Sequence, residues 1–333
     1  MPEIVQWTTI KDRFEDGLLL GNGASMAVHT GFGYGNLYEE ACRLEHVSEP
    51  VQKIFDSFET TDFELVLRQL WHAKLMNEAL DIPPGRVENA YELVRTALIS
   101  TVRATHVSHT AARPHLERIY PFMQGFKTIV SLNYDLILYW AAMLGNNVVG
   151  RWFKDAFVGS KFRDDWETVR EPYGAKEATL FFYPHGNLAL ARSSFSEEDK
   201  IDGGNGTDLL ESILQRWETG EKSPLFVCEG TSLHKKKSIE SSSYLQTVFR
   251  EVLPRIGESL VICGWNLAEQ DKHIVKQLGK GTLKRVAISV HNNDMAFMQR
   301  VEETLRAQDF QDIYFFDSSS LGCWNNSVEI EIA

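Results

Sequence analysis

Cysteine is scarce in this sequence, and the few cysteines are far apart. The chain has no C-x-x-C pair and no H-E-x-x-H motif; its four cysteines are Cys42, Cys228, Cys263 and Cys323. This spacing excludes a conventional zinc ribbon and provides no disulfide framework, so we expect no bound metal. Cys228 and Cys263 end apolar runs, and we expect them to be small core residues.

Long hydrophobic runs and an excess of basic residues are also missing. The longest apolar segment, Leu136 to Leu144, is far too short to span a bilayer and is expected to begin a buried helix. The N-terminal Met1-Pro2-Glu3 lacks the features of a secretory signal. Lys and Arg number 34 against 46 Asp and Glu, a net charge of −12 that repels nucleic acid. We therefore predict a cytoplasmic protein that binds neither membrane nor nucleic acid. We interpret the cationic run Lys235-Lys236-Lys237 as a solvated face, with contact to an anion as the alternative.

What the sequence does contain is a set of six short apolar runs, each of which stops at polar, often glycine-containing residues. Continuous apolar runs of this length indicate strands that are buried on both faces, as in a parallel sheet covered by helices. The loops at the carboxyl ends of such strands converge on one crevice, so we expect these six loops to form one site. The runs begin at Gly17, Thr128, Leu180, Leu225, Leu260 and Val286.

We predict an α/β fold, a Rossmann-like parallel sheet of about six strands with helical insertions, in a single domain over 1–333. The largest insertion, at about 40–125, contains a helical stripe for which Thr61 or Asp62 is the expected cap. A second helix is expected from Val87 to about Thr105, and another from Tyr244 to Leu253. Smaller insertions are expected at about 140–178 and 190–225, and residues 193–207 are expected to form a mobile loop. The stripe consists of Phe63, Val66, Leu67, Leu70 and Trp71.

The first loop, Gly21-Asn22-Gly23-Ala24-Ser25, follows a strand directly, as the pyrophosphate loop of dinucleotide-binding proteins does. Its glycines would allow a tight turn and a close approach to phosphates. Met26 stands where G-x-G-x-x-G requires its third glycine, and no acidic residue ends a second strand about 20 positions on. A dehydrogenase is therefore weakly supported, and a purely structural turn remains an alternative.

Polar side chains follow the other strands. Asn133 and Asp135 suit a ribose, a carboxamide or an ordered water, although helix capping is an equal alternative. His185 follows an aromatic strand, and a near-neutral pKa would suit it for general base catalysis, unless it is structural. Asp271 is expected to cap the helix from Lys272 to Leu278 rather than to bind adenosine. Gly230-Thr231-Ser232-Leu233-His234 fails G-x-S-x-G, so a serine hydrolase is not supported.

In combination these segments resemble the sirtuin family, specifically its zinc-free bacterial branch. Gly21 to Ser25 is similar to the Gly-Ala-Gly-x-Ser NAD loop, and Ser131 to Asp135 resembles Thr-x-Asn-x-Asp. His185-Gly186 matches the catalytic His-Gly, and Gly264-Trp265-Asn266 with Asp271 resembles the Gly-Tyr-Ser…Asp ending of that branch. Asp62-Phe63-Glu64 with Leu67 and Leu70 resembles its helical segment. The chain departs from protein deacylases in lacking a four-cysteine zinc module.

The resemblance implies an NAD-consuming effector of bacterial antiphage defence. The segment from Glu229-Gly230-Thr231 through Lys235 and Ile239 to Tyr244-Leu245 is similar to the effector subunit of Kongming-type systems. Such a subunit would act in an oligomer with a nucleoside-triphosphate pyrophosphatase-like partner that gates its activity.

The expected activity is NAD hydrolysis to nicotinamide and ADP-ribose in abortive infection. The resemblance implies that Asn133 positions the ribose and the attacking water, that Asp135 holds the carboxamide and that His185 engages the ribose hydroxyls. A non-catalytic NAD or ADP-ribose sensor that acts through a partner, or an ADP-ribosyl transferase or cyclase, remains an alternative. The pyrophosphate is assigned to Gly21, Gly23, Ala24 and Ser25, and the adenosine side to Gly230, Thr231, Ser232, Gly264 and Trp265, with Asp271 close by.

Overall fold

The computed structural model describes residues 3–33, 35–193, 197–202, 209–220, 222–227 and 231–326. Its centre is a sheet of eight parallel strands in the order β1-β13-β12-β11-β2-β3-β7-β4. Every residue of β2, β3, β7 and β11 is buried. Since neighbouring side chains in a strand point to opposite faces, both faces of the sheet are covered. The bounds are β1 (Ile4–Val5), β2 (Gly17–Leu20), β3 (Thr128–Ser131), β4 (Phe153–Lys154), β7 (Thr179–Phe182), β11 (Ser259–Cys263), β12 (Arg285–Val290) and β13 (Asp312–Asp317).

The predicted α/β class with a Rossmann-like parallel sheet is confirmed, but the sheet has eight strands where about six were expected. Five of the six predicted runs belong to it, as β2, β3, β7, β11 and β12. The additional strands are β1 and β4, each only two residues long, and β13, which begins with an exposed aspartate. β1 and β4 are too short to be recognised as apolar runs, whereas β13 contains the apolar run Ile313 to Phe316, which fits the pattern but was not selected.

The strand predicted at Leu225 is wrong in its placement. It is β10 (Lys222–Phe226), and it pairs antiparallel with β8 (Gly186–Ser193) in a second sheet. This sheet has five strands in the order β10-β8-β9-β6-β5 among the described residues. The short apolar run from Leu225 to Cys228 in the sequence predicts a buried strand but does not indicate to which sheet the strand belongs. The other bounds are β5 (Phe157–Val158), β6 (Lys161–Phe162) and β9 (Glu198–Lys200).

The second sheet includes parts of both smaller insertions. Residues 157–162 form the β5–β6 hairpin, and 198–200, within the segment expected to be a mobile loop, form strand β9. Residues 194–196 and 203–207 of that segment lie outside the described residues.

Gly186 has φ +76°, and a Cβ on this residue would overlap the carbonyl oxygen of Leu225 in β10. Only glycine therefore fits at the start of β8.

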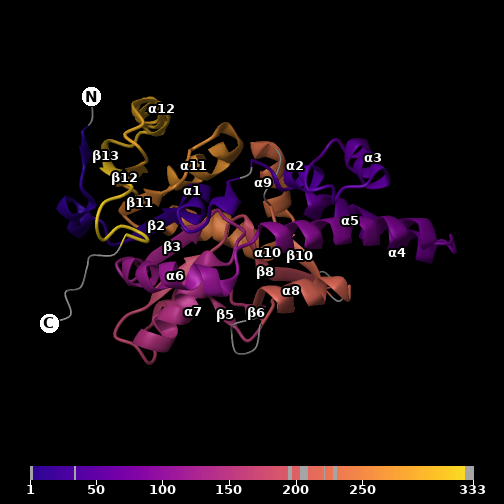
Figure 1. The fold of residues 1–333 in the computed structure, drawn as a ribbon. Coiled ribbons are helices and arrows are strands. Elements are labelled where there is room, and N and C mark those ends of the chain that lie inside the picture. The colour runs from indigo at the N-terminus through magenta and orange to yellow at the C-terminus, as the bar shows by residue number, and fades with distance from the viewer. Residues whose placement is uncertain are drawn as a thin grey trace.

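The helical insertion is confirmed. It comprises five helices, of which α4 and α5 extend away from the main sheet (Figure 1). The Asp62 carboxylate caps α4, as predicted, and accepts hydrogen bonds from the backbone N–H groups of Glu64 (2.9 Å) and Leu65 (3.2 Å). The bounds are α2 (Leu37–Arg43), α3 (Glu49–Ser57), α4 (Phe63–Ala79), α5 (Gly85–Thr105) and α6 (His109–Met123).

The remaining helices connect the strands. The predicted helix at Leu136 is confirmed as α7, and the one at Tyr244 is a continuous helical segment that begins with α10 and runs on to Arg255. One cluster of buried apolar side chains includes residues from the main sheet, the second sheet and α4 and α5. The bounds are α1 (Asn22–Met26), α7 (Ile137–Val149), α8 (Leu209–Glu218), α9 (Ser232–Glu240), α10 (Ser243–Thr247), α11 (Lys272–Leu278) and α12 (Met295–Arg306).

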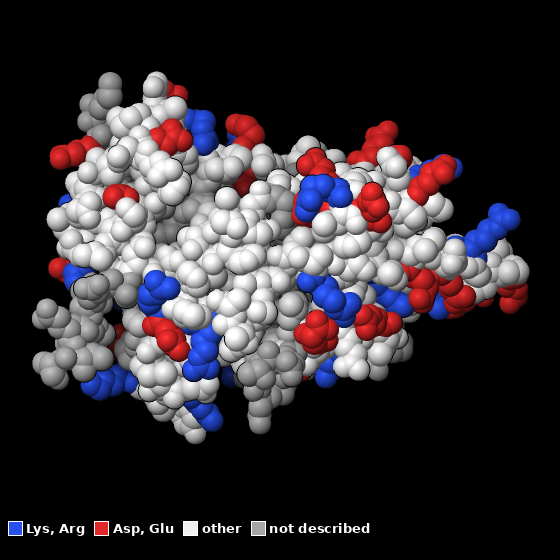
Figure 2. All heavy atoms as spheres, in the orientation of Figure 1, with Lys and Arg blue, Asp and Glu red and all other residues white. Residues whose placement is uncertain are grey.

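The surface carries charges of both signs. Figure 2 shows acidic and basic side chains interspersed on the viewed face, with no continuous basic surface.

Among the described helices, none is long and apolar enough to cross a membrane. Cys263 is buried, as expected, whereas Cys228 lies outside the described residues.

Candidate active site

The carboxyl ends of β2 and β11 meet backbone to backbone. The N–H of Gly21 donates to the Cys263 carbonyl (2.9 Å), and that of Gly23 donates to the Gly264 carbonyl (2.7 Å). A Cβ on Gly21 would lie 2.6 Å from the Cα of Trp265, and one on Gly23 would lie 2.8 Å from the Cα of Gly264. The glycines are therefore required by the contact between the two loops, in addition to any contact with a ligand.

Asn133, at the end of β3, fixes the first loop. Its amide donates to the Gly21 carbonyl (2.9 Å) and to Ser25 Oγ (2.8 Å). Ser25 Oγ in turn donates to Asp135 Oδ2 (2.5 Å). The other carboxylate oxygen of Asp135 accepts the N–H of Ile137 (2.8 Å), so Asp135 holds the first turn of α7 while Asn133 caps no helix. Burial raises the pKa of Asp135, although the Ser25 and Ile137 hydrogen bonds oppose that shift.

His185 follows β7 and is buried against a histidine that the sequence analysis did not select. Its Nε2 lies 3.0 Å from Nε2 of His273 on α11, and His273 Nδ1 lies 3.1 Å from Ser232 Oγ. Burial, followed by the nearby positive charge of Lys235, lowers the pKa of His185 well below 6.5, and burial lowers that of His273 to about 4. The predicted near-neutral pKa of His185 is therefore wrong, because an imidazole without solvent is held in its neutral form.

Hydrogen bonding fixes the tautomers of this pair. The ring of His185 also bonds to the backbone of Leu132, whose carbonyl can only accept. The remaining ring nitrogen of His185 must then accept from His273, and His273 Nδ1 accepts from the Ser232 hydroxyl. The result is a directed chain of hydrogen bonds from Ser232 through two neutral imidazoles to the end of β3.

A buried ion pair adjoins the histidines. Lys235 Nζ lies 2.8 Å from Asp271 Oδ1, and Trp265 Nε1 donates to Asp271 Oδ2 (3.3 Å). Burial alone would raise the pKa of Asp271, but neighbouring groups, chiefly His185 and Lys235, lower it on balance. Because His185 is neutral at pH 7, the Lys235 ammonium supplies the permanent positive charge.

These contacts correct two expectations. Asp271 stands at the N-terminal boundary of α11, but its side chain makes no capping hydrogen bond and pairs with Lys235 instead. Lys235 is not part of a solvated face, since its side chain is only 7% exposed. Lys235 and Ile239 lie on the buried face of α9, and this i, i+4 spacing was the available signal for its burial.

His185, Asp271 and His273 form the one potential metal-binding group among the described residues, with one ligand atom from each within 4.8 Å of the others. Two imidazoles and a carboxylate are suitable ligands for zinc or another transition metal. The Lys235 ammonium, however, lies 2.8 Å from the same carboxylate and would have to be displaced by a cation. These three side chains can therefore bind a metal only if the ion pair between Lys235 and Asp271 is broken.

The loops enclose a pocket of about 490 Å³. Most of the predicted site residues line it. Four described ones do not: Ala24 and Ser25 lie behind its wall, Thr231 caps α9, and Ser232 bonds to His273. Gly230 lies outside the described residues. The lining also includes residues that the sequence analysis did not assign to the site: Asn22, Phe32, Asn36, Lys235, Asn266 and Gln270. The predicted residues in the lining are Gly21, Gly23, Asn133, Asp135, His185, Gly264, Trp265 and Asp271.

The protein thus has a parallel α/β fold with a pocket at the carboxyl ends of β2, β3, β7 and β11, lined by both polar and apolar side chains. The chain belongs to the family described as "Domain of unknown function (DUF4917)", which matches residues 18–324. No curated protein matches the chain.

Proposed function

We propose that this protein hydrolyses NAD to nicotinamide and ADP-ribose. The observation that carries the proposal is the convergence of Asn133, Asp135 and His185 with the Gly21 and Gly264 loops on one pocket. Its volume of about 490 Å³ is within the range of small-molecule and cofactor sites. Position also supports it, since ligands of open parallel sheets bind outside the carboxyl ends of the strands.

The proposed chemistry is cleavage of an N-glycosidic bond through an oxocarbenium-like transition state. An amide can position the attacking water, and this is the role assigned to Asn133. Asp135 is assigned to the nicotinamide carboxamide, and both side chains line the pocket and are held in place by hydrogen bonds. The amide of Asn133 has both N–H groups engaged, which leaves its oxygen for the water or the ribose.

The low pKa of His185 defines its part in the proposal. A base with so low a pKa takes a proton poorly from a ribose hydroxyl at pH 7. A neutral imidazole can still hydrogen-bond to that hydroxyl and orient the sugar. We therefore assign His185 as an orienting group, with His273 and Ser232 fixing its tautomer.

The remaining pocket residues would hold the rest of NAD. The Gly21 and Gly23 backbone is assigned to the pyrophosphate, and Gly264 with the Trp265 ring to the adenosine. Ser25 and Ala24 would support the loop from behind, because Ser25 Oγ is engaged by Asn133 and Asp135. We propose further that the protein is an antiphage effector whose activity is gated by a pyrophosphatase-like partner.

The proposal is tested with purified protein and NAD by following free nicotinamide. Asn133→Ala and His185→Ala should each reduce its release by on the order of 100-fold or more. His234→Ala, which removes an exposed histidine from α9, should retain the wild-type rate. Folded Asn133 and His185 variants with near wild-type turnover would contradict the assignment. Product masses separate a hydrolase from a cyclase or transferase.

A non-catalytic NAD or ADP-ribose sensor is the second candidate. The contacts of Asn133 with Gly21 and of His185 with His273 favour it, since both side chains are already engaged in holding the pocket together. For a sensor, NAD or ADP-ribose should raise the melting temperature while no nicotinamide appears. Unfolding of both alanine variants would likewise indicate a structural role.

A further inference from the structure

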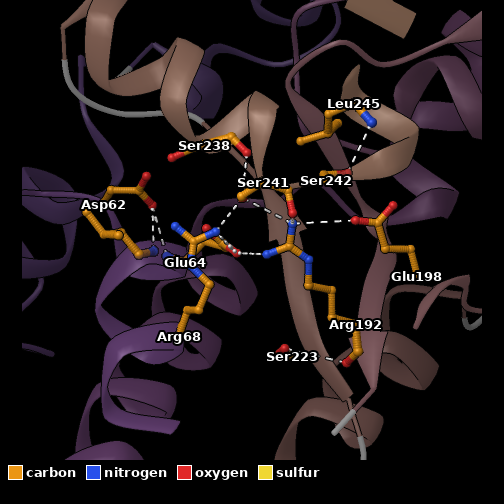
Figure 3. Close-up of polar contacts among 11 residues, drawn as sticks. Asp62, Glu64, Arg68, Arg192, Glu198, Ser223, Ser238, Ser241, Ser242 and Leu245 are labelled. Atoms are coloured by element: carbon orange, nitrogen blue, oxygen red, sulfur yellow. Dashed lines mark hydrogen bonds and ion pairs between the residues drawn. The ribbon is translucent and has the colours of Figure 1, made fainter. Parts of the chain in front are cut away.

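Side chains from distant parts of the chain donate hydrogen bonds to the last carbonyl groups of two short helices. The first case lies away from the candidate active site (Figure 3). There the Arg192 guanidinium of β8 donates to the Ser241 carbonyl at the end of α9 (2.8 Å) and to the Glu64 carboxylate of α4 (3.0 Å). Because the final carbonyls of a helix have no partner within the helix, such a donor holds the helix end in place. The second case adjoins the candidate active site, at α1.

Helix α1 includes most of the Gly21–Ser25 loop and is only five residues long. It ends early, because the N–H of Val28, which would continue the helix by donating to the Ala24 carbonyl, donates to the Ser25 carbonyl instead (2.9 Å). The Ala24 carbonyl accepts a buried hydrogen bond from Nε1 of Trp324 (2.8 Å). A side chain from beyond β13 thus takes the place of the missing helical donor.

Trp324 belongs to the segment 318–326, which follows β13 and is fixed by its own hydrogen bonds. The Asn326 amide, for example, donates to the Ser318 carbonyl (2.9 Å). A second side chain of the segment also reaches α1, since the Asn325 amide donates to the Ala27 carbonyl (2.8 Å). Two neighbouring side chains of one fixed segment therefore hold the end of α1.

The conformation of Trp324 shows that its position is enforced. Its φ is +47°, a value that bulky residues rarely adopt and keep only where the surrounding contacts require it. The residue is 5% exposed, and its ring packs edge-on against Phe122 of α6 with the centroids 6.4 Å apart. This strained backbone places the indole N–H at the Ala24 carbonyl.

Ala24 connects this contact to the pocket. The residue before it, Gly23, lines the pocket, and the residue after it, Ser25, bonds to Asn133 at the end of β3 (2.8 Å). The loop is thus held by the main sheet on the pocket side and by Trp324 on the opposite side. Without the indole N–H, the Ala24 carbonyl would be buried with no donor and could regain one only if the loop moved.

We propose that Trp324 is a positioning residue of the candidate active site, which holds the Gly21–Ser25 loop in the arrangement that receives the pyrophosphate of NAD. The proposal rests on the proposed function, from which it takes the ligand of this loop. Trp324 does not line the pocket and acts through the Ala24 carbonyl. It therefore contributes to the binding of any ligand that contains this pyrophosphate, and not to cleavage of the glycosidic bond.

The test compares the purified wild type with Trp324→Phe, which removes the indole N–H and keeps an aromatic ring. The dissociation constant of ADP-ribose, measured by calorimetry, and the KM for NAD should both rise about 10-fold, because a buried carbonyl loses its donor. Nicotinamide release at saturating NAD should stay within about 2-fold of the wild-type rate. Trp152→Phe is the matched control: it removes an indole hydrogen bond to Thr179 Oγ1 (3.0 Å) at the start of β7, away from the pocket, and should change none of these constants.

Hydrogen exchange provides a readout that needs no ligand. In Trp324→Phe the backbone N–H groups of residues 22–29 should exchange about 10-fold faster, while those of α12 exchange as in the wild type. Asn325→Ala removes the neighbouring donor from a half-buried side chain and should weaken ADP-ribose binding about 3-fold. This second variant keeps the test decisive if Trp324→Phe does not fold.

The outcomes separate this proposal from the proposed function. Wild-type affinity for ADP-ribose in Trp324→Phe, or in Asn325→Ala if the first variant does not fold, overturns this proposal alone. Slower nicotinamide release at saturating NAD with unchanged affinity overturns it as well, because Trp324 would then act on the chemical step. A wild-type protein that binds neither NAD nor ADP-ribose overturns the proposed function, and with it the ligand assigned to this loop.

Discussion

Gly264 shows how strongly one residue determines the geometry of the candidate site. It has φ +68°, and a Cβ there would overlap the backbone nitrogen of Ala24 in the facing loop. The backbone conformation and the contact both exclude any larger residue. The residue therefore sets how closely the ends of β2 and β11 approach, and with that the shape of the pocket between them.

Gly264→Ala should consequently lower the free energy of unfolding by about 2 kcal/mol or more, because it adds left-handed backbone strain to a steric overlap. Chemical denaturation measures the change. Gly85→Ala is the matched control: Gly85 begins α5, and no atom lies within 4 Å of the position that its new methyl group would occupy, so the same substitution should be neutral or stabilising. Equal effects of the two substitutions would show that the close approach of the loops is not required.

The buried histidines make a prediction about pH. Burial lowers the pKa values of His106 and His273 to about 4 and that of His185 well below 6.5. In the unfolded chain each titrates near 6.5, so between pH 6.5 and about 4 the unfolded state binds more protons than the native state. The free energy of unfolding should therefore fall as the pH drops through this window, by about 1.5 kcal/mol from pH 6.5 to pH 5 for each of His106 and His273, and His185 contributes in the same direction.

Denaturation at a series of pH values tests this slope. His273→Gln should reduce the pH dependence of the free energy of unfolding by the contribution of roughly one proton. This holds even if the substitution also changes the stability at pH 7. His234→Gln, on the exposed surface of α9, should follow the wild type. A wild-type stability that stays flat from pH 7 to pH 5 would contradict the neutral His185–His273 pair.

At the scale of elements, the candidate site depends on how α9 and α11 pack. Lys235 and Ser232 on α9 reach Asp271 and His273 at the start of α11, so two polar contacts join the helices. Removing Lys235 would leave the Asp271 carboxylate buried beside two neutral imidazoles.

Lys235→Met should therefore lower the free energy of unfolding by about 3 kcal/mol, as expected for one partner of a buried ion pair. Lys236→Met removes the neighbouring lysine, which is half exposed and 3.9 Å from Glu240, and should change stability by less than about 1 kcal/mol. Thermal or chemical denaturation compares the two. If both lysines prove equally dispensable, the buried pair does not hold α9 against α11.

The elements also show what the sequence could and could not predict. β2, β3, β7, β11 and β12 were predictable because a strand buried on both faces must be continuously apolar. Asn133 and His185 followed, since they stand directly after such strands. Lys235 and His273 could not be assigned to the site, because their contacts depend on the packing of two helices that are distant in the chain. β10 was assigned to the wrong sheet, because the burial of an apolar run does not specify which sheet the strand joins.

At the scale of the whole molecule, the candidate active site and the second sheet lie in different parts of the fold. The candidate active site is at the carboxyl ends of the main sheet, whereas the second sheet and α4 and α5 lie beside the main sheet and share its apolar core (Figure 1). The insertions at 140–178 and 190–225 supply most of the second sheet, and none of their described residues lines the candidate active site. They are therefore the surface through which we expect a partner to act.

An unregulated NADase would exhaust the NAD of its own cell, so we predict that the isolated chain is nearly inactive. A partner or ligand can activate it only by binding the active arrangement more tightly than the inactive one. Expression of the chain alone should leave cellular NAD close to its normal level, while expression with its genomic neighbours under phage challenge should deplete it. His185→Ala in the complete set is the control and should prevent depletion. Full NAD depletion by the lone wild-type chain at modest expression would show that no partner is needed and that the second sheet has another role.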